Sequence, residues 1–234
     1  MKLSIVIPVY NEKNTIQEIL RAVDGVYLEG VEKEIIVIDD GSTDGTGELL
    51  RGLEGQYRIL YQSSNGGKGL ALRRGFEEAT GDFIVNQDAD LEYDPSDYGV
   101  MLKPIQNNEA DVVFGSRRLD SSKVKNAYRR YLWGGIFVNK LVNLIGGISM
   151  TDIFSGSKIF PRSALGRFSL HSKGFEVETE LSIKLSRAGY RIVEVPISYV
   201  ARTISDGKKI RPHDALRILK SAFRSRTEPV LKHD

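Results

Sequence analysis

The sequence of 234 residues contains no cysteine and only three histidines. The absence of cysteine excludes disulfides and thiolate metal sites, and it fits a reducing compartment. His171, His213 and His233 are too far apart along the chain to form a metal-ligand pattern. The formal net charge of +2 shows no strong excess of either sign, so we predict no nucleic-acid partner.

Long uninterrupted apolar runs are also missing. The opening run MKLSIVIPVYNE breaks at Pro8 and lacks the length and cleavage site of a signal peptide, so we interpret it as a strand. Segment 131–150 is apolar, but Asn139, Lys140 and Asn143 interrupt it. A membrane-spanning helix needs roughly 20 predominantly apolar residues. We therefore expect this segment to lie within the protein or on a surface.

The first half of the chain alternates short apolar segments with segments of helical periodicity. The apolar, β-branched segments predict strands at 3–9, 34–40, 57–62, 82–88 and 111–116. The segments between them predict helices at 15–26, 46–54, 67–80 and 95–108. Continuous apolar strands separated by helices are typical of a mostly parallel sheet that is covered on both faces. Residues 1–116 are thus predicted to form a doubly wound, Rossmann-like α/β unit.

The composition changes after Ser116. From Arg117 to Lys140 there are seven basic residues and one acid, Asp120. Regular patterns return with a predicted helix at 175–189, a strand at 190–200 and a basic helix at 214–226. No linker or internal repeat separates the halves. We predict a single continuous domain with three parts, residues 1–116, 117–212 and a basic amphipathic tail at 213–234.

Polar clusters follow the first four predicted strands: PVYNE, DDGSTDGT, SSNGGKG and QDADLE. In an open α/β sheet, ligands bind outside the carboxyl ends of the strands. The four clusters therefore predict a crevice along one edge of the sheet.

The second and third clusters each admit two interpretations. Ser42, Thr43 and Asp44 suit helix capping. Asp39 and Asp40 are adjacent and cannot both be caps, so they suit hydrogen bonds to the base or ribose of a nucleoside. The segment NGGKG allows close backbone approach to a ligand, with Lys68 meeting a phosphate, but a simple turn before a helix explains it equally well. It has neither the Walker A nor the GxGxxG spacing.

The fourth cluster carries three acids at alternate positions. In an extended chain Asp88, Asp90 and Glu92 point to one side. Carboxylates this close repel one another unless a cation lies among them. Oxygen ligands select Mg²⁺ or Mn²⁺, which often binds through one or two carboxylates and the substrate's phosphates. The pattern predicts a site for a metal-bridged diphosphate, and the alternative is an acidic surface loop.

In order and spacing, IPVYNE, VIDDGSTDGT, NGGKG and DADLEYDP resemble the signatures of inverting family 2 glycosyltransferases with the GT-A fold. DAD then stands at the DXD metal motif. Further along, VVFGSR, MTDIFSGSKIF, GFEVETEL and EVPISYVARTISDGKK resemble the dolichol- and polyprenyl-phosphate hexosyltransferases. The resemblance covers roughly residues 3–212. It makes 1–116 the nucleotide-sugar half and 117–212 the acceptor half.

The resemblance implies a role for each matching residue. The donor would be held by Pro8, Tyr10, Glu12, Asp39, Asp40, Lys68, Asp88, Ala89 and Asp90. The metal, Mg²⁺ or Mn²⁺, would be held by Asp90 and Glu92, although relatives often carry glutamine or serine at the latter position. The catalytic residues would be Asp88, Asp90, Arg117 and Arg202. The acceptor phosphate would meet Arg117, Arg129, Arg130, Lys208 and Lys209. For any single arginine, a solvated surface charge is the alternative.

The implied reaction moves a hexose, with inversion, from GDP-mannose or UDP-glucose to dolichyl or polyprenyl phosphate. An acceptor phosphate is mostly dianionic at neutral pH and needs little help from a base. A sugar hydroxyl would need one, and Asp152, Glu176, Glu178 and Glu180 are candidates. The last three also suit the start of a helix, where acids favour the dipole. Alternatives are transfer to a hydroxyl of a glycan or glycolipid, and a catalytically silent nucleotide-sugar-binding subunit.

We expect a cytoplasmic protein with peripheral contact at the inner face of the membrane. Basic region 117–140 and the tail helix would meet a polyprenyl acceptor there. In that helix Leu216, Leu219 and Phe223 share one face that basic residues flank, a pattern found in helices that lie on anionic membranes. Such helices also pack on protein cores, so both interpretations stay open.

Overall fold

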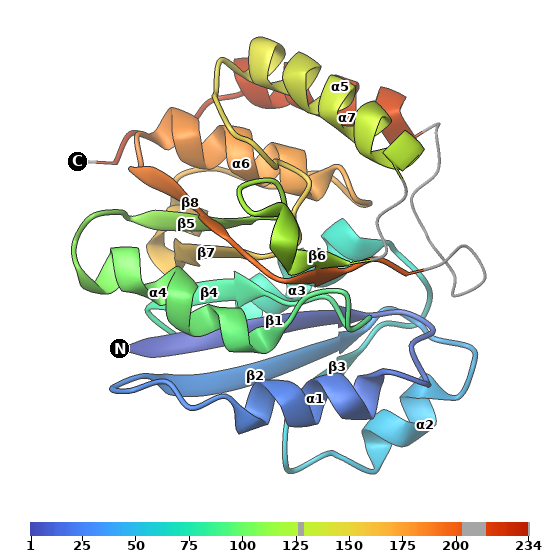
Figure 1. Ribbon diagram of the computed structural model, residues 1–234. Helices are drawn as coiled ribbons and strands as arrows, with labels where there is room; N and C mark the ends of the chain where they lie inside the picture. Colours follow the sequence, from blue (N-terminus) through green and yellow to red (C-terminus); the bar gives the residue numbers. More distant parts are fainter. Residues whose placement is uncertain (126–128, 203–213, 234) are drawn as a thin grey trace.

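The computed structural model describes residues 1–125, 129–202 and 214–233, except for the side chains of residues 129–133 (Figure 1). The strands are β1 (Lys2–Val9), β2 (Glu32–Asp39), β3 (Arg58–Tyr61), β4 (Phe83–Asn86), β5 (Val112–Ser116), β6 (Val124–Lys125), β7 (Lys158–Pro161), β8 (Ile192–Pro196) and β9 (Tyr199–Val200). The α-helices are α1 (Ile16–Gly25), α2 (Thr46–Arg51), α3 (Lys68–Glu78), α4 (Tyr98–Gln106), α5 (Arg129–Gly146), α6 (Val177–Ala188) and α7 (Asp214–Thr227). Three 3₁₀ turns lie at Pro95–Asp97, Ser121–Lys123 and Arg162–Gly166.

Seven strands form one sheet in the order β3-β2-β1-β4-β7-β5-β8. All pairs within it are parallel except those of β7, which runs antiparallel to both β4 and β5. The predicted mostly parallel, doubly wound sheet is confirmed. Strand β7 was not predicted, because it is short and lies in a glycine-rich segment. It comes from the second half of the chain and pairs with β4 and β5 of the first half, so the halves share one sheet and one domain.

The two faces of the sheet bury separate apolar clusters, as the alternation of side chains along a strand requires. Ile5 and Ile7 of β1 pack in one cluster with residues of α1 and α4. Val6, between them, packs in the other cluster with Phe76 of α3 and Leu181 of α6. Figure 1 shows α1 and α4 on one side of the sheet. This packing holds the carboxyl ends of β1, β2 and β4 at one edge.

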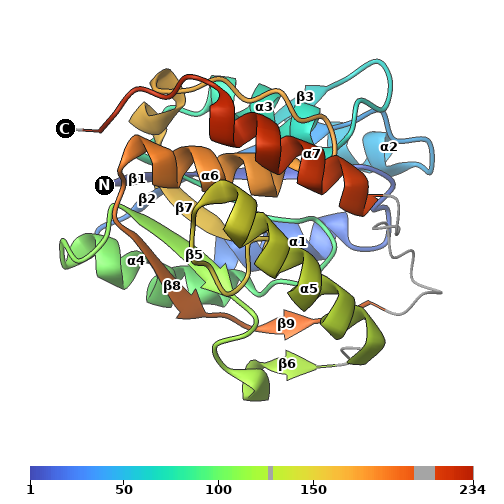
Figure 2. The same ribbon diagram turned by 90° about the horizontal axis from the view of Figure 1, so that it is seen from above.

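Helices α5 and α7 form an outer layer over α6, as the view from above shows (Figure 2). Val142, Ile183 and Ile218, one from each helix, share a third apolar cluster. Segment 131–150, expected within the protein or on a surface, supplies most of α5. Asn139 accepts a hydrogen bond from the Ile153 amide and donates one to a backbone carbonyl, so this polar interruption fastens the following loop. Among the described residues, no helix combines the length and the apolar character needed to cross a bilayer.

The predicted strand 190–200 is divided in two. Strand β8 extends the large sheet, while β9 pairs with β6 in a separate two-stranded sheet. Beyond β8 the chain turns, and the Val200 amide donates to the Glu92 carbonyl at 2.9 Å. This bond carries Tyr199 and Arg202 to the acids that follow β4.

Candidate active site

The predicted crevice residues lie at the carboxyl ends of the parallel strands, on the right in Figure 1. Glu12 follows β1, Asp39 ends β2, Asp88 follows β4, and Arg117 follows β5. Asn11 adopts a positive φ of 54°, which turns the chain sharply after β1. Four strands thus supply the site. The polar clusters predicted this for β1, β2 and β4, and β5 is the addition.

Asp39 and Asp40 fasten the loops around the end of β2. Asp39 accepts a hydrogen bond from the Ser42 amide at 3.0 Å. The two oxygens of Asp40 accept the amides of Gly66 and Gly67, each at 2.8 Å. Burial raises the pKa of Asp40, and these two amides oppose the rise. Asp40 therefore fixes the glycine loop NGGKG beside the end of β2, where a nucleoside would approach.

Gly41 is required where these loops meet. Its φ is +70°, and an added Cβ would lie 2.7 Å from the backbone carbon of Ser64. A larger residue would be strained in this conformation and would separate the two loops.

Lys68 does not present a free ammonium group to the crevice. Its Nζ lies 2.6 Å from Asp88 Oδ1 and 3.0 Å from Glu178 Oε1, and its side chain is 11% exposed. Burial opposes the charged form, but these two carboxylates raise the pKa of Lys68 above its ordinary value. Lys68 thus neutralises Asp88 in the structure.

A single arginine binds the acids after β4 to the end of β1. Arg202 donates through Nη1 and Nη2 to the two carboxylate oxygens of Glu12, at 3.1 and 2.7 Å. Its Nε donates to the Asp90 carbonyl at 3.0 Å, and its amide donates to Glu92 Oε1 at 2.8 Å. The Tyr199 hydroxyl donates to Glu92 Oε2 at 3.0 Å. The structure therefore brings the predicted Glu12, Asp90, Glu92 and Arg202 into one cluster.

The acids of this cluster fit a divalent cation that also binds the substrate. Burial, together with repulsion from Asp88 and Glu92, raises the pKa of Asp90 to about 7. A cation among these carboxylates would relieve that repulsion. Within the described part of the chain, no group of three or more His, Cys, Asp or Glu side chains is placed to hold a metal. Mg²⁺ and Mn²⁺ sites completed by substrate phosphates need only one or two carboxylates, and Asp90 and Glu92 supply that number.

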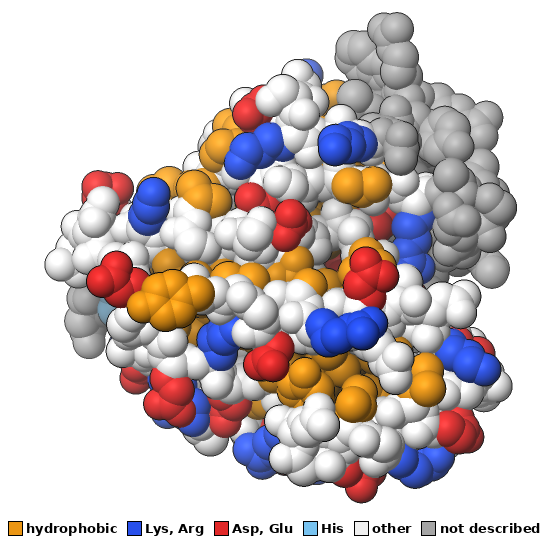
Figure 3. Space-filling model, turned by 60° about the horizontal axis from the view of Figure 1, so that its bottom comes forward, with side chains coloured by type: hydrophobic (Ala, Val, Ile, Leu, Met, Phe, Trp, Pro, Cys, Tyr) orange, Lys and Arg blue, Asp and Glu red, His pale blue; other side chains and the backbone are white. Residues whose placement is uncertain are grey.

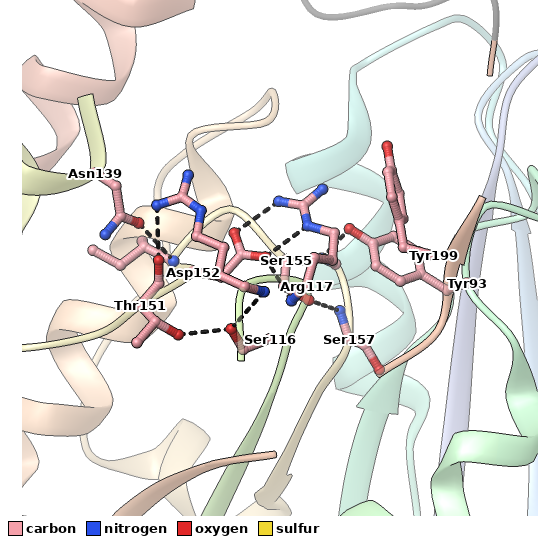
Figure 4. Close-up of polar contacts among 12 residues, drawn as sticks. Tyr93, Ser116, Arg117, Asn139, Thr151, Asp152, Ser155, Ser157 and Tyr199 are labelled. Atoms are coloured by element: carbon pink, nitrogen blue, oxygen red, sulfur yellow. Dashed lines mark hydrogen bonds and ion pairs between the residues drawn. The ribbon is translucent and has the colours of Figure 1, made fainter. Parts of the chain in front are cut away.

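Arg117, which follows β5, is held by the buried acid Asp152 (Figure 4). Its Nε and Nη2 donate to the two oxygens of Asp152 at 2.6 and 2.8 Å. Burial alone would raise the pKa of Asp152, but the Arg117 guanidinium holds it below its ordinary value. The guanidinium carbon lies 4.9 Å from the centre of the Tyr199 ring. Tyr199 thus contacts both Glu92 and Arg117.

The four candidate bases for a hydroxyl acceptor are all engaged. Asp152 is fully buried against Arg117. Glu178 and Glu180 form buried ion pairs with lysines. Glu176 accepts a hydrogen bond from the Gly174 amide at 3.1 Å. The helix-start interpretation of the three glutamates is therefore incomplete, because two of them are paired inside the protein.

Sequence reasoning did not single out Tyr93, Lys158 or Tyr199. The Tyr93 hydroxyl accepts from the Gly156 amide at 3.1 Å, and the Arg117 guanidinium lies over its ring, 5.9 Å from the centre. Both tyrosines stand inside motifs that the resemblance used, DADLEYDP and EVPISYVARTISDGKK. Those motifs could have marked the two tyrosines as site residues. Their contacts could not be predicted, because the residues they contact are distant in sequence.

The remaining predicted residues fall into two groups. Pro8 pairs with Ile38 across β1 and β2, Tyr10 follows β1, and Ala89 is buried between the two aspartates. The predicted acceptor residues Lys208 and Lys209 lie outside the described residues, as do the side chains of Arg129 and Arg130 at the start of α5.

Comparison with known proteins gives three findings. The family described as glycosyl transferase family 2 matches residues 4–168. The chain is 31% identical over 212 residues to a dolichol-phosphate mannosyltransferase of Pyrococcus furiosus, covering 89% of this chain but 59% of that protein. It is also 31% identical over 221 residues to an undecaprenyl-phosphate mannosyltransferase of Micrococcus luteus, covering 89% of this chain and 87% of that one.

Among solved structures, glucosyl-3-phosphoglycerate synthase of Mycobacterium tuberculosis, in complex with Mn²⁺, UDP and phosphoglyceric acid, shares the fold. The TM-score is 0.73 and the sequence identity 21%, over 97% of this chain and 79% of that one.

Proposed function

The chain belongs to glycosyl transferase family 2, and on that premise we propose that it transfers a hexose from a nucleotide diphosphate sugar to a polyprenyl phosphate of the dolichol type. Two mannosyltransferases similar to it are named for such acceptors. The proposed metal is Mg²⁺ or Mn²⁺, held by Asp90 and Glu92. When bound, it neutralises charge on the diphosphate.

The donor half of the reaction rests on the residues after β1, β2 and β4. We assign the nucleoside to the end of β2, beside Asp39 and beside the glycine loop that Asp40 holds through the amides of Gly66 and Gly67. Asp88 contacts the donor beside the metal site. Arg202 lies among the acids, and its Nη2 is 2.7 Å from Glu12 Oε2. A guanidinium at this position stabilises the negative charge that develops on the departing nucleotide diphosphate, an effect that commonly dominates such catalysis.

The observation that carries the choice of acceptor is that three of the four candidate bases are buried in ion pairs, while the fourth, Glu176, accepts a hydrogen bond from the Gly174 amide. Asp152, Glu178 and Glu180 are buried and ion-paired, so none is available to remove a proton from a hydroxyl. A phosphate acceptor is already mostly dianionic at neutral pH and needs no base. Arg117, fixed by Asp152 and next to Tyr199, supplies a preoriented cation to receive it.

The outer layer offers a surface for a lipid-linked acceptor. We define the platform as the exposed Phe137 and Leu144 of α5 with Leu216 and Phe223 of α7. Exposed basic side chains accompany them at Lys140, Arg217 and Lys220. The face around α1 and α2 also carries apolar side chains, with charges of both signs interspersed among them (Figure 3). Apolar side chains next to basic ones suit the surface of an anionic bilayer, so the platform is our proposed membrane contact.

The proposal is tested by presenting two acceptors that differ in one group. The purified chain is incubated with Mn²⁺, radiolabelled GDP-mannose or UDP-glucose, and either a polyprenyl phosphate or the corresponding polyprenol. We expect labelled lipid with the phosphate alone, and with one of the donors. Transfer to the polyprenol would favour a hydroxyl acceptor instead, and no transfer to either would contradict the proposal.

The metal assignment has its own variant. Asp90→Asn should lower turnover by about 10²- to 10³-fold, the range for loss of one charge-stabilising group. Glu77→Gln is the matched control, because it removes an exposed carboxylate at the end of α3 opposite to Lys68. Equal turnover in Asp90→Asn and Glu77→Gln would refute the assignment of Asp90.

A further inference from the structure

Asp88 belongs to a set of four charged side chains, which we call the quartet: Lys68, Asp88, Lys158 and Glu178. Lys158 and Glu178 are buried, and Lys68 and Asp88 are half-buried. They come from α3, the loop after β4, β7 and α6. Lys68 Nζ contacts Asp88 Oδ1 at 2.6 Å and Glu178 Oε1 at 3.0 Å. Lys158 Nζ contacts Glu178 Oε2 at 2.7 Å. The four groups form one chain of ion pairs that ends at Asp88.

Exposure rises along this chain from Lys158 to Asp88. The exposed fraction of the side chain is 0% for Lys158, 4% for Glu178, 11% for Lys68 and 20% for Asp88. Two cations and two anions sum to zero, so each buried charge has a counter-charge. Burying an ion still costs several kcal/mol, and apolar replacements of buried ion pairs are often neutral or stabilising. Stability alone therefore gives no reason for four charges at this position.

The quartet also fixes the backbone on the other side of Asp88. Lys158 Nζ donates to the carbonyls of Ile153, at 3.0 Å, and Ser155. These contacts hold the loop that carries Gly156. A Cβ added to Gly156 would lie 2.4 Å from Asp88 Oδ2. The Asp88 carboxylate is thus held by Lys68 through one oxygen and bounded by the loop at the other.

We propose that Glu178 and Lys158 are positioning residues that, through Lys68 and the Gly156 loop, fix the direction in which Asp88 faces the donor. This inference rests on the proposed function, since it assigns Asp88 to donor binding. Lys68 then acts on the donor through Asp88 and does not meet the phosphate itself.

Variants that change the net charge of the quartet distinguish a positioning role from a purely structural one. Glu178→Gln leaves the quartet with an excess of one positive charge, so both lysines compete for Asp88. Lys158→Met leaves one excess negative charge, so Glu178 and Asp88 compete for Lys68. The double variant restores neutrality and leaves Lys68 with Asp88 as its only charged partner. We expect each single change to weaken nucleotide binding in the presence of Mn²⁺ by about 10- to 100-fold, as loss of supporting contacts does at metal sites.

The measurement is the dissociation constant of GDP and of UDP with Mn²⁺ by calorimetry, together with the Tm of each variant. The double variant should bind more tightly than either single variant, even if its Tm stays low. Lys184→Met is the matched control, because Lys184 is an equally buried lysine in α6 whose partners, Glu180 and Glu228, lie outside the quartet. It should lower the Tm and leave the dissociation constant unchanged.

A second variant displaces Asp88 without changing any charge. Gly156→Ala adds one methyl group next to Asp88 Oδ2, while the control Gly99→Ala places its methyl in open space. We expect Gly156→Ala to weaken nucleotide binding and Gly99→Ala to leave it unchanged. Gly156→Ala tests the position of Asp88 even if Glu178→Gln does not fold. Wild-type affinity in all folded variants would overturn the inference while leaving the proposed function intact. Failure of the wild-type protein to bind any nucleotide would overturn the proposed function and, with it, this inference.

Discussion

At the scale of single residues, Tyr199 joins the two sides of the proposed site. Its hydroxyl donates to Glu92, and its ring lies beside the Arg117 guanidinium. The sequence predicts the acids of DADLE and the arginine of GSR as site residues, because each residue type indicates its chemistry. The tyrosine is not, because its partner Glu92 is 107 positions away. Chain topology, which no local pattern contains, makes this contact.

Two substitutions of Tyr199 should separate its two contacts. Tyr199→Phe removes the hydroxyl bond to Glu92 but keeps the ring, so the Mn²⁺ concentration for half-maximal activity should rise by about 10-fold or more. The KM for the acceptor should stay unchanged. Tyr199→Ala also removes the ring beside Arg117, so both quantities should rise. Activity measured against Mn²⁺ and against acceptor concentration gives both values.

Tyr61→Phe is the matched control, because Tyr61 donates to Glu54 at 2.8 Å in an exposed pair. It should change neither quantity. An unchanged Mn²⁺ requirement in Tyr199→Phe would show that Glu92 does not depend on this hydrogen bond for its role.

At the scale of elements, helix α6 shows what periodicity predicts and what it omits. The predicted helix is present, and Glu178 and Glu180 lie in its first turn. Their partners are Lys158 of β7 and Lys184, one turn further along α6. The pattern cannot show that both acids point into the protein, because burial depends on β7 and on the α5–α7 layer. Neither β7 nor α5 was predicted, since glycines and asparagines obscure those segments.

The pair of Glu180 and Lys184 should make stability depend on pH. Burial alone would raise the pKa of Glu180, but hydrogen bonds from Lys184 and Ser172 hold it below its ordinary value of 4.5. The folded protein therefore binds this proton less readily than the unfolded chain. The stabilisation is complete above about pH 4.5 and is lost as the pH falls through the lower folded-state value.

Glu180→Gln should lower the free energy of unfolding at pH 7 by about 1.5 to 3 kcal/mol, the range for hydrogen bonds to charged groups. The difference from wild type should shrink as the pH falls below 4.5, the ordinary pKa of this carboxyl. Urea unfolding at several pH values measures it. Glu48→Gln, in an exposed pair with Arg51, is the control and should have little effect at any pH. A difference that does not change with pH would contradict the ion-pair explanation.

At the scale of the whole molecule, the proposed site lies where the two halves of the chain meet. Asp88, Asp90 and Glu92 come from the first half, and Arg117 and Arg202 from the second. Strand β7 pairs with β4 and β5 and so joins the halves within the sheet. The boundary at residue 116 that composition predicted separates the proposed donor half from the proposed acceptor half, and it remains a prediction about their roles. The sequence predicts which residues gather at the strand ends, whereas the contacts between halves depend on the sheet order.

The platform gives the molecule one side that suits contact with a membrane. The platform consists of exposed side chains of α5 and α7, the two helices that form the layer above α6 (Figure 2). Helix α5, Arg129–Gly146, contains no acidic residue. We expect the protein to sediment with vesicles that contain phosphatidylglycerol and to bind less to pure phosphatidylcholine, because the basic residues favour an anionic surface. Added salt should weaken this binding by screening.

Leu216 and Phe223 are 74% and 61% exposed, so replacing them with serine should alter the surface and not the core. Each loses apolar area that would be buried in the bilayer, at about 25 cal/mol per Å², and we expect vesicle binding to fall about 10-fold or more for each. Tyr27→Ser is the matched control, because Tyr27 is 85% exposed and follows α1, which packs on the face of the sheet opposite to α6. If Tyr27→Ser lowered binding as much as Phe223→Ser, the bilayer would not be meeting the platform, and the route proposed for the lipid acceptor would be wrong.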